Sequence, residues 1–428
     1  MPDIAAGSIV VVYDKGAASA GEIGAGIRRT GIPVVTVLGD SEHARSMRPL
    51  VGEFGPVVSL DAGFGAAVDA LRAVGVRAVT TFSERMQHTT ALLAERLALP
   101  YHSPATVRLL TDKAAQRRCL REAGIPQARS HRLDRAAQWP EAVAVTGLPA
   151  VLKPVRGEGS RNTYLVQDPD EGRELAEALL SDAETALVLE EFLAGRSELP
   201  FGDYVSVECL VQDGEVRVLA VTGKPALLPP FRETGQFWPS HLPAPEVAAL
   251  GSLAADAVRA LGVRSGITHT EIKLTPHGPR IIEVNGRLGG WVGELAQRAA
   301  GLSLVEVAGR IALGERVHVP PLSFDGVYFQ FSTPGPREAC TLTRRQGVAD
   351  VRALEGVTGI VPLVRRGERL PGGVHTALLD IAFGHAPDHA AMLATVEKAA
   401  GLLSYTFTTD DGRVHRATAA ELKGNGLV

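Results

Sequence analysis

Residues 266–290 form two strand-like runs whose charges a simple hairpin would not favour. Both runs are rich in β-branched and apolar residues, and a turn rich in Pro and Gly separates them at residues 276–279. Because strand side chains alternate between two faces, His269, Glu271 and Lys273 share one face of the first run. This charged face is a candidate site for polar chemistry.

The second run places a further acidic residue against the first. Symmetric pairing about His277 puts Glu271 opposite Glu283 and His269 opposite Asn285. Like charges that face each other across strands destabilise the pair by up to about 1 kcal/mol. A hard divalent cation such as Mg²⁺ would reverse that penalty, because it prefers carboxylate and amide oxygens. Alternation predicts that four side chains share one face of the second run: Ile281, Glu283, Asn285 and Arg287.

A helix start follows these candidates closely. Gly289 and Gly290 lead into a predicted helix at residues 291–300, and helix N-termini bind anions. Metal ligands, Arg287 and a helix start therefore fall within a short span, which suits an anionic substrate. A surface hairpin with solvated charges is the alternative interpretation.

A second group of candidates surrounds Lys153, which ends a predicted strand at residues 148–153. In the loop that follows, Gly157, Gly159 and Ser160 allow backbone amides to approach phosphates closely. The loop does not open a helix with GK[ST], so it is not a Walker loop. As a glycine-rich loop between two strands, it is interpreted as a flap that closes over a nucleotide; a plain turn is the alternative.

The apolar strand predicted at residues 186–193 ends in two acidic residues, Glu190 and Glu191. A strand followed by a kinked connection can offer backbone groups and a carboxylate to an adenine ring. A solvated strand end is the alternative interpretation.

Composition bounds the class of protein. The chain has 428 residues, enough for two to four domains, with 45% apolar and 21% charged residues. A net charge of −4 gives no bulk electrostatic argument for nucleic acid or an anionic membrane. No apolar run is long enough to span a bilayer, and the first apolar run lacks a basic region before it. We therefore expect a cytoplasmic protein with neither a membrane nor a nucleic acid as partner.

The three cysteines are Cys119, Cys209 and Cys340, and they lie far apart in the chain. Their odd number and wide spacing match neither a metal motif nor a disulfide framework. Cys119 falls in a helical pattern and Cys209 in a strand pattern, so both are interpreted as packing residues and not as nucleophiles.

The first hundred residues alternate strand and helix patterns, which predicts a parallel α/β sheet. The expected strands are at 8–13, 33–38, 57–60 and 78–81, and the expected helices at 21–30, 64–74 and 88–97. The glycines after the first strand do not complete GxGxxG, because the pattern needs glycine at Arg29. Nicotinamide binding is therefore disfavoured.

Helix signals precede the lysine region. Ser103 with Pro104 is typical of a helix start, and a second helix is expected from Asp112 to Gly124. Strand patterns at residues 148–153, 186–193 and 204–211 then indicate an α+β module, and a smaller α+β domain is expected after about residue 320.

Taken in order, these segments resemble an ATP-grasp carboxylate–amine ligase. The segments are DKxxxRxxLxxAGIP-like residues 112–126, Lys153, the glycine loop, EEFL at 190–193, Glu271 with Glu283-x-Asn285-x-Arg287, and the GG helix. The resemblance covers residues 100–310 and implies a multidomain α/β and α+β fold. It implies an N-terminal parallel α/β domain (1–105), a lid and ATP-binding subdomain (106–195), a central antiparallel domain (196–315) and a C-terminal α+β subdomain (316–428).

The same resemblance implies roles for the nucleotide and metal residues. Lys113, Lys153 and the flap residues Gly157, Gly159 and Ser160 would contact ATP. The adenine would be held by the segment of Glu190, Glu191, Phe192 and Leu193, and two Mg²⁺ ions by Glu271, Glu283 and Asn285. Arg287 would stabilise the transferring phosphoryl group. A carboxylate would attack the γ-phosphate to give an acyl phosphate and ADP, and an amine would then displace phosphate.

Three features resemble the L-amino acid ligases that make dipeptides: HTEIK at 269–273, Trp291 four residues after Arg287, and RETGQFWPSHLP at 232–243. The resemblance implies that Trp291 limits the pocket for the amino-terminal substrate, or else is a core residue of the helix. His269 would face the substrate carboxylate or be structural. The implied substrate residues are Arg232, Glu233, His269, Arg287, Gly289, Gly290 and Trp291.

The implied partners are amino acids or short peptides, with a homodimer as the expected assembly. Two alternatives stay open. A biotin-carboxylase-like or purine-pathway enzyme would share the ATP residues but activate bicarbonate or formate. A regulator that only binds ATP would not need the full set of Glu271, Glu283, Asn285 and Arg287.

Overall fold

The N-terminal domain is a parallel sheet with helices on both faces. The computed structural model describes residues 5–182 and 184–424. The strand order is β3-β2-β1-β4, with β1 (Ile9–Tyr13), β2 (Val34–Leu38), β3 (Val57–Ser59) and β4 (Ala78–Thr80). All three pairings are parallel, which confirms the predicted α/β sheet. The flanking helices are α1 (Ala20–Arg28), α2 (Glu42–Gly52), α3 (Phe64–Ala73) and α4 (Gln87–Leu97).

The helix α2 was not predicted. It contains Pro49, and its apolar stripe is limited to the buried Ala44 and Val51 with the partly buried Met47 between them. Its first turn is instead defined by Ser41, whose hydroxyl accepts a hydrogen bond from the Ala44 amide.

Two helices lead from this domain to the nucleotide region: α5 (Pro104–Thr111) and α6 (Lys113–Glu122). Both predicted starts are confirmed, because the Ser103 and Asp112 side chains accept hydrogen bonds from the Thr106 and Ala115 amides. The chain then leaves α6 through Gly124, whose φ of +72° favours glycine.

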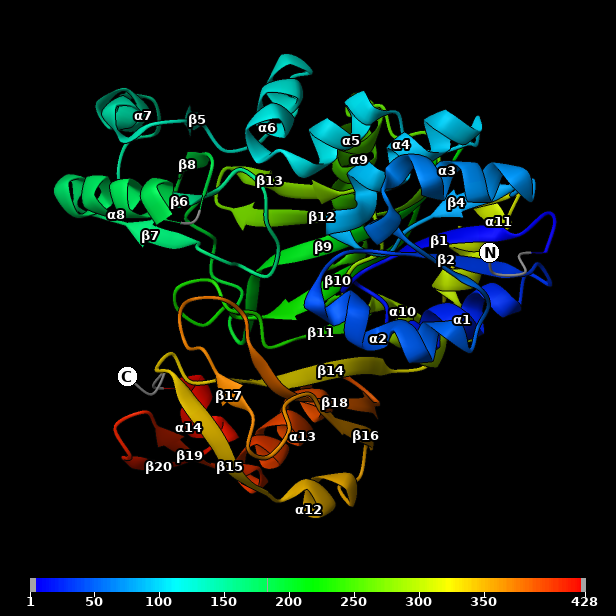
Figure 1. Ribbon diagram of the computed structural model, residues 1–428. Coiled ribbons are helices and arrows are strands. Elements are labelled where there is room, and N and C mark those ends of the chain that lie inside the picture. The colour runs from blue at the N-terminus through cyan, green and yellow to red at the C-terminus, as the bar shows by residue number, and fades with distance from the viewer. Residues whose placement is uncertain (1–4, 183, 425–428) are drawn as a thin grey trace.

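A small antiparallel sheet forms the lid, which projects from the upper left of the molecule in Figure 1. Its strand order is β5-β8-β6-β7, with β5 (Ser130–Leu133), β6 (Ala150–Pro154), β7 (Tyr164–Val166) and β8 (Leu187–Glu191). Two helices pack on it, α7 (Trp139–Thr146) and α8 (Pro169–Asp182). Trp139, Leu152 and Leu189 belong to one buried cluster, so the lid has its own core.

The central element is an eight-stranded sheet in which each neighbouring pair is antiparallel. In spatial order the strands are β13 (Gly278–Asn285), β12 (Gly266–Thr275), β9 (Phe201–Gln212), β10 (Glu215–Pro225), β11 (Gly235–Trp238), β14 (Val327–Pro334), β18 (Leu378–Ala386) and β16 (Val357–Pro362). The helix α9 (Ala244–Ala260) covers one face. The sheet continues past residue 316, so the predicted domain boundary there does not coincide with a sheet edge.

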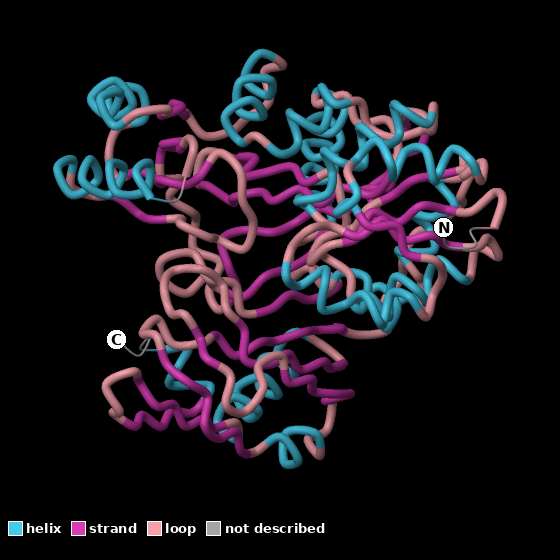
Figure 2. Tube along the Cα trace, viewed as in Figure 1, coloured by secondary structure: helices cyan, strands magenta, loops and turns pink. Residues whose placement is uncertain are grey.

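The C-terminal strands form a second sheet below the first, as Figure 2 shows in magenta. Its order is β17-β15-β19-β20, with β15 (Cys340–Gln346), β17 (Arg369–Leu370), β19 (Ser404–Thr409) and β20 (Val414–Thr418). The helices of this region are α12 (Val348–Arg352), α13 (His389–Leu402) and α14 (Ala419–Gly424). Phe329 of β14 and Phe407 of β19 belong to one cluster, so the two sheets share a core.

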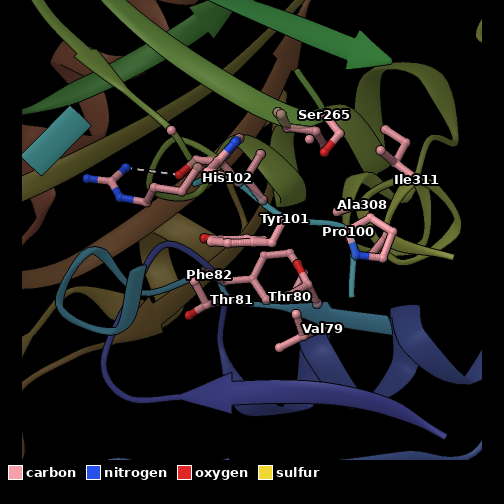
Figure 3. A pocket seen from close by; sticks show the side chains of 16 residues that line it. Val79, Thr80, Thr81, Phe82, Pro100, Tyr101, His102, Ser265, Ala308 and Ile311 are labelled. Carbon is pink, nitrogen blue, oxygen red and sulfur yellow. Dashed lines mark hydrogen bonds between the residues drawn. The ribbon is translucent and has the colours of Figure 1, made fainter. Parts of the chain in front are cut away.

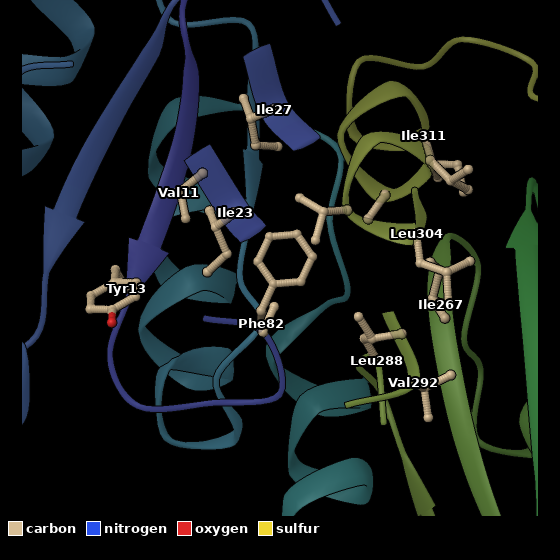
Figure 4. Close-up of a cluster of buried hydrophobic side chains, with 14 of the residues drawn as sticks. Val11, Tyr13, Ile23, Ile27, Phe82, Ile267, Leu288, Val292, Leu304 and Ile311 are labelled. Carbon is tan, nitrogen blue, oxygen red and sulfur yellow. The ribbon is translucent and has the colours of Figure 1, made fainter. Parts of the chain in front are cut away.

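A buried cluster fastens the N-terminal domain to the central sheet. Figure 4 shows Ile23, Ile27 and Phe82 of the first domain facing Ile267 of β12 and Leu288. The helices α10 (Val292–Ala300) and α11 (Leu304–Ala312) complete the cluster. The end of the β12–β13 hairpin is therefore held against the N-terminal domain. No helix in the described part of the chain has the length and apolar character needed to cross a membrane.

The interface between α1 and α10 contains a carboxylate with an unusual environment. A Cβ atom added at Gly293 would lie 2.0 Å from Glu22 Oε1, so this carboxylate packs against the first turn of α10. Burial, together with the nearby charge of Glu294, raises the pKa of Glu22 to about 7.

We predict that Glu22→Gln stabilises the protein at pH 8 but has little effect at pH 5. A carboxyl whose folded pKa is raised contributes most stability below its unfolded pKa of about 4.3 and loses it as pH rises through about 7. Thermal unfolding at both pH values measures the difference. Glu42→Gln, in the exposed first turn of α2, is the matched control, and an equal shift at both pH values would contradict the prediction.

Candidate functional site

The β12–β13 hairpin sets two carboxylates opposite each other. Glu271 pairs with Glu283, and His269 pairs with Asn285, which confirms the predicted register at these positions. Three oxygen-bearing side chains therefore gather on neighbouring strands at one edge of the sheet.

The turn of this hairpin is not where symmetric pairing placed it. Near the turn, Lys273 pairs with Arg280, one position short of the expected partner. A β-bulge at residues 281–283 takes up the difference before the two glutamates meet. The bulge also turns Ile281 into the apolar core with Val284, so the prediction that Ile281 shares the face of Glu283 was wrong.

His269 lies between two carboxylates. Its Nδ1 is 3.0 Å from both Glu208 oxygens, and its Nε2 is 3.6 Å from Glu271 Oε1. Burial alone would lower the pKa of His269, but the Glu208 carboxylate overrides it and raises the pKa to about 9. The imidazolium therefore compensates Glu271, and burial is likewise outweighed at Glu271, whose pKa is lowered to about 2.

Glu208 is a functional candidate that the sequence did not reveal. It is fully buried on β9, pairs directly with His269, and accepts further hydrogen bonds from Ser206 and Thr222. The signal was a glutamate within the buried part of β9, at positions 204–211. Close approach also explains Gly289, where an added Cβ would lie 2.4 Å from His269 Nδ1.

Lys113 joins two parts of the site. One is the carboxylate floor, which is the facing pair of Glu271 and Glu283, and the other is the flap, which is the glycine loop with Gly157, Gly159 and Ser160. Its Nζ is 2.9 Å from Glu283 Oε1 and donates a 2.8 Å hydrogen bond to the Gly157 carbonyl. Burial opposes the charged form, but Glu283 wins and the pKa of Lys113 is raised. The predicted phosphate lysine thus lies beside a predicted metal ligand.

Lys153 belongs to a buried cluster with Glu190 and Arg117. Lys153 Nζ is 2.8 Å from Glu190 Oε2, while Arg117 Nε and Nη2 donate to the two Glu190 oxygens at 2.9 and 3.1 Å. Burial would raise the pKa of Glu190, but these cations hold it at about 2. Burial also lowers the pKa of Lys153. The Glu190 carboxylate, predicted to face adenine, is therefore engaged on both oxygens, and Arg117 is a residue that the sequence missed.

The hinge after β8 is fixed to the lid. Glu191 accepts from the Arg129 amide at 2.9 Å and from Arg129 Nε at 2.6 Å, and the Phe192 amide donates to the Pro149 carbonyl at 3.1 Å. Leu193 follows as a half-buried residue. The position of this segment next to Lys153 suits the predicted adenine contact.

The glycine loop reaches across to two other segments. Gly157 and Gly159 have φ values of +151° and +64°, where side chains are rarely accepted. Ser160 Oγ donates to the Phe231 carbonyl at 2.8 Å, and the Thr376 amide donates to the Gly159 carbonyl at 3.0 Å. These hydrogen bonds tie the glycine loop to the β10–β11 loop and to the loop before β18.

Arg287 is paired with an N-terminal residue that was not predicted. Its Nε is 3.1 Å from Glu84 Oε2, and its Nη2 is 3.4 Å from Asn285 Oδ1. Burial raises the pKa of Glu84, against the charge of Arg287. Glu84 begins the 3₁₀ turn η2 (Glu84–Met86) shortly after β4. Ligands of parallel α/β sheets bind at the carboxyl ends of strands, and that rule was the available signal.

A small cavity of about 40 Å³ lies at the domain joint beside Arg287 (Figure 3). Phe82, Tyr101 and His102 line it from the N-terminal side, and Ile311 from α11. Burial lowers the pKa of His102 to about 4, so its ring is neutral. The cavity is separate from the carboxylate floor and contains none of the predicted metal ligands.

Trp291 is the N-cap of α10, and the helix begins one residue later than predicted. Its backbone is left-handed, with a φ of +62°, and its carbonyl accepts from Gln330 Nε2 at 3.0 Å. The neighbouring Gly290 carbonyl accepts from Gln236 Nε2 at 2.9 Å. The half-buried indole lies 6.1 Å, centroid to centroid, from Phe383. Strands on both sides of the domain boundary therefore position this residue.

The predicted substrate loop contributes a cationic side chain and an acidic one. Arg232 is only 3% exposed, and its guanidinium donates to the Pro229 and Gly335 carbonyls at 3.3 and 2.9 Å. Glu233 Oε2 is 3.4 Å from the Nζ of Lys224, a buried lysine that the sequence analysis missed. The charge of Lys224 also contributes to the lowered pKa of Glu271.

The donor set fits a hard cation. In the described ranges no three His, Cys, Asp or Glu side chains converge, and the set is two carboxylates with one amide oxygen. His269 and Lys113 place positive charge next to the carboxylates of Glu271 and Glu283, where a bound metal ion would also add positive charge. Such oxygens suit Mg²⁺ that also binds substrate phosphates.

The site lies within an ATP-grasp domain. Residues 146–294 match the family model of the ATP-grasp domain. A solved L-amino acid ligase from Bacillus licheniformis has the same fold, with a TM-score of 0.76 at 21% identity over 94% of this chain and 98% of that one. The predicted multidomain ATP-grasp fold is therefore confirmed.

Curated relatives carry names of the predicted enzyme class. Carnosine synthase 1 of Gallus gallus is 30% identical over 70% of this chain and 33% of its own length. Alanine–anticapsin ligase of Bacillus subtilis (strain 168) is 29% identical over 51% of this chain and 49% of its own length. The chain spans less than two thirds of the length of the first curated relatives it matches.

We predict that Glu190→Gln destabilises the protein by about 3 kcal/mol or more, because it leaves Lys153 and Arg117 buried without a counter-charge. Glu191→Gln, which breaks a pair with the 62% exposed side chain of Arg129, should cost less than about 1 kcal/mol. Urea unfolding measures both. A carboxylate with a depressed pKa contributes above its unfolded pKa and loses that stability as pH falls toward 2. The difference between wild type and Glu190→Gln should therefore shrink from pH 6 to pH 3, and equal costs for both variants would refute the cluster's role.

Proposed function

We propose that this protein is an ATP-dependent ligase that joins the carboxylate of one amino acid to the amine of a second amino acid or short peptide. The observation that carries the proposal is the Arg287–Glu84 pair beside the carboxylate floor. The reaction would proceed through an acyl phosphate and release ADP and phosphate.

The Arg287–Glu84 pair complements a free amino acid. Such a substrate carries a carboxylate and an ammonium a few bonds apart, and these charges match a guanidinium and a carboxylate whose atoms lie 3.1 Å apart. An ammonium near Glu84 would also offset the burial that raises the pKa of this carboxyl. Since Arg287 contacts Asn285, the bound carboxylate would lie next to the phosphoryl group.

The nucleotide would occupy the space between lid and floor. Lys113, Lys153 and the amides of the glycine loop would hold the phosphates, and the backbone of residues 191–193 would hold adenine. Glu271, Glu283 and Asn285 would hold two Mg²⁺ ions, which would neutralise phosphate charge. Glu208 would act through His269 to keep Glu271 in position.

The chemistry needs positioning and charge more than covalent help from the protein. A donor carboxylate oxygen attacks the γ-phosphorus, the bond to the bridging oxygen breaks, and ADP leaves. The acceptor amine then attacks the acyl carbon and loses a proton as phosphate departs. Arg287 and Lys224 would stabilise negative charge on the phosphoryl and acyl oxygens. A closed flap would protect the acyl phosphate from water.

We predict that Glu283→Gln abolishes ADP release, because it removes a metal ligand and the partner of Lys113. The expected loss is at least about 100-fold, consistent with loss of a preorganised charge at a phosphoryl-transfer site. The assay measures ADP across all pairs of the twenty amino acids, with mass spectrometry of products. Glu215→Gln, whose side chain is 64% exposed on β10, is the control.

Near-normal turnover by the folded variant would remove the metal assignment. The same assay with bicarbonate and formate separates the other enzyme class: ADP release with these acids and with no amino acid would point to a carboxylase-like reaction. Nucleotide binding without any turnover would indicate a regulator.

We predict that Trp291→Ala admits bulkier amino-terminal substrates, because the indole would limit the donor pocket. Hydroxylamine traps the acyl phosphate as a hydroxamate, so the donor profile can be measured without an acceptor. Relative rates for leucine and phenylalanine should rise about tenfold or more against alanine, as expected for a relieved steric limit in an apolar pocket. An unchanged profile with a lower melting temperature would assign the indole to the core instead.

A further inference from the structure

The outer wall of the site is built where the flap, the β10–β11 loop and two C-terminal loops meet. The Thr376 amide bonds the Gly159 carbonyl at 3.0 Å, and Ser160 bonds the Phe231 carbonyl at 2.8 Å. Arg232 bonds the carbonyl of Gly335, also at the C-terminal side. In Figure 1 the orange loop before β18 rises toward the green loops of β10 and β11.

Four cationic or basic side chains surround this junction. Arg337 and His375 lie on the two C-terminal loops, which are joined by a 2.8 Å hydrogen bond from the Gly373 amide to the Arg337 carbonyl. Burial and the charges of Lys15 and Arg232 lower the pKa of His375, and burial and Arg337 lower the pKa of Arg232. These effects agree with the hydrogen bonds that bring the loops of Arg232, Arg337 and His375 together, and they add the charge of Lys15, an exposed residue that follows β1.

Arg232 has no counter-charge at this junction. In the part of the chain that the structure describes, its guanidinium donates only to the Pro229 and Gly335 carbonyls and contacts no carboxylate. The neighbouring Glu233 is paired with Lys224 instead. A buried cation without a partner costs several kcal/mol, and nearby like charges add to that cost. A bound anion would reverse both effects.

The other anions of the proposed reaction have their own partners. Lys113 and Lys153 flank the phosphate region, and Arg287 is placed for the donor carboxylate. The remaining anion is the carboxylate of the amine-donating substrate. The position of the cationic group suits this carboxylate, because one member of the group lies near the proposed donor site. Lys15 follows β1, and its backbone carbonyl accepts a hydrogen bond from the Ser83 hydroxyl, next to Glu84.

We propose that Arg232, Lys15, Arg337 and His375 form a binding site for the carboxylate of the amine-donating substrate. The proposal rests on the proposed ligase function and names its acceptor class: amino acids or short peptides with a free carboxylate. Two of the four groups come from the C-terminal loops, so this part of the chain contributes directly to acceptor choice.

The test compares acceptors that differ only in that carboxylate. Wild-type protein is assayed with a donor that yields a hydroxamate, using each of the twenty L-amino acids and its α-amide as acceptors. The kcat/KM for the acid should exceed that for the amide by roughly 10- to 100-fold, the value of a charge-assisted contact. Arg232→Met should reduce this preference to about threefold or less.

Hydroxylamine provides the internal control, because it is an amine without a carboxylate. The hydroxamate rate and the KM for ATP of Arg232→Met are measured alongside, so that a general loss of activity is distinguished from a loss of acid preference. The double variant Lys15→Met/His375→Ala leaves the buried arginine in place and should lower the acid preference in the same direction. Arg316→Met, whose side chain is 86% exposed on the far surface, should keep it.

The outcomes distinguish whether the cationic group binds a substrate carboxylate or a nucleotide phosphate. If Arg232→Met and the double variant raise KM for ATP and lose hydroxamate formation, the group binds nucleotide phosphate and the inference is overturned. Equal use of acids and amides by wild-type protein also overturns it. If no amino acid gives a hydroxamate with wild-type protein, the proposed ligase function itself fails.

Discussion

The opposition of Glu271 and Glu283 across the β12–β13 hairpin is the constraint on which the site depends. Two facing carboxylates disfavour the pairing, yet apolar residues on the other face of the hairpin hold the register. The cost is offset by two cations: His269 of the hairpin itself, held by Glu208 of β9, and Lys113 from α6. Positive charge is therefore recruited from separate segments to one edge of the sheet.

Contacts between opposite charges also join the domains. Lys113 links the floor to the flap, Arg117 and Lys153 meet on Glu190 at the lid, and Glu84 ties the N-terminal domain to Arg287. Lys113, Arg117 and Glu84 reach these contacts from elements outside the sheets, whereas Lys153 and Glu190 lie on paired strands of the lid. The charges that would handle phosphate also define how the domains fit together.

The sequence was most informative where local rules apply. Alternation and turn chemistry predicted the strands, the caps of α5 and α6, and the register of the two glutamates. The sequence did not reveal that the turn is shifted by half a residue or that a bulge compensates for the shift. The position of a bulge depends on which side chains pack into the core. Glu84 and Arg117 were missed because their partners, Arg287 and Glu190, lie 70 or more residues away in the chain. Glu208 was missed because it lies within a buried strand, and Lys224 because its local sequence does not mark its pairing with Glu233. The helix α2 was missed because it contains Pro49 and its apolar stripe is short.

The continuity of the central sheet into the C-terminal half separates two tasks within one chain. The residues proposed to bind ATP lie before residue 288, whereas the contacts that set Trp291 come from Gln330 of β14 and Phe383 of β18. Substitutions in those two later strands can reshape a substrate pocket through backbone and ring contacts without altering a phosphate or metal ligand. A family with this arrangement can diversify its choice of acid while the energy-coupling apparatus is conserved.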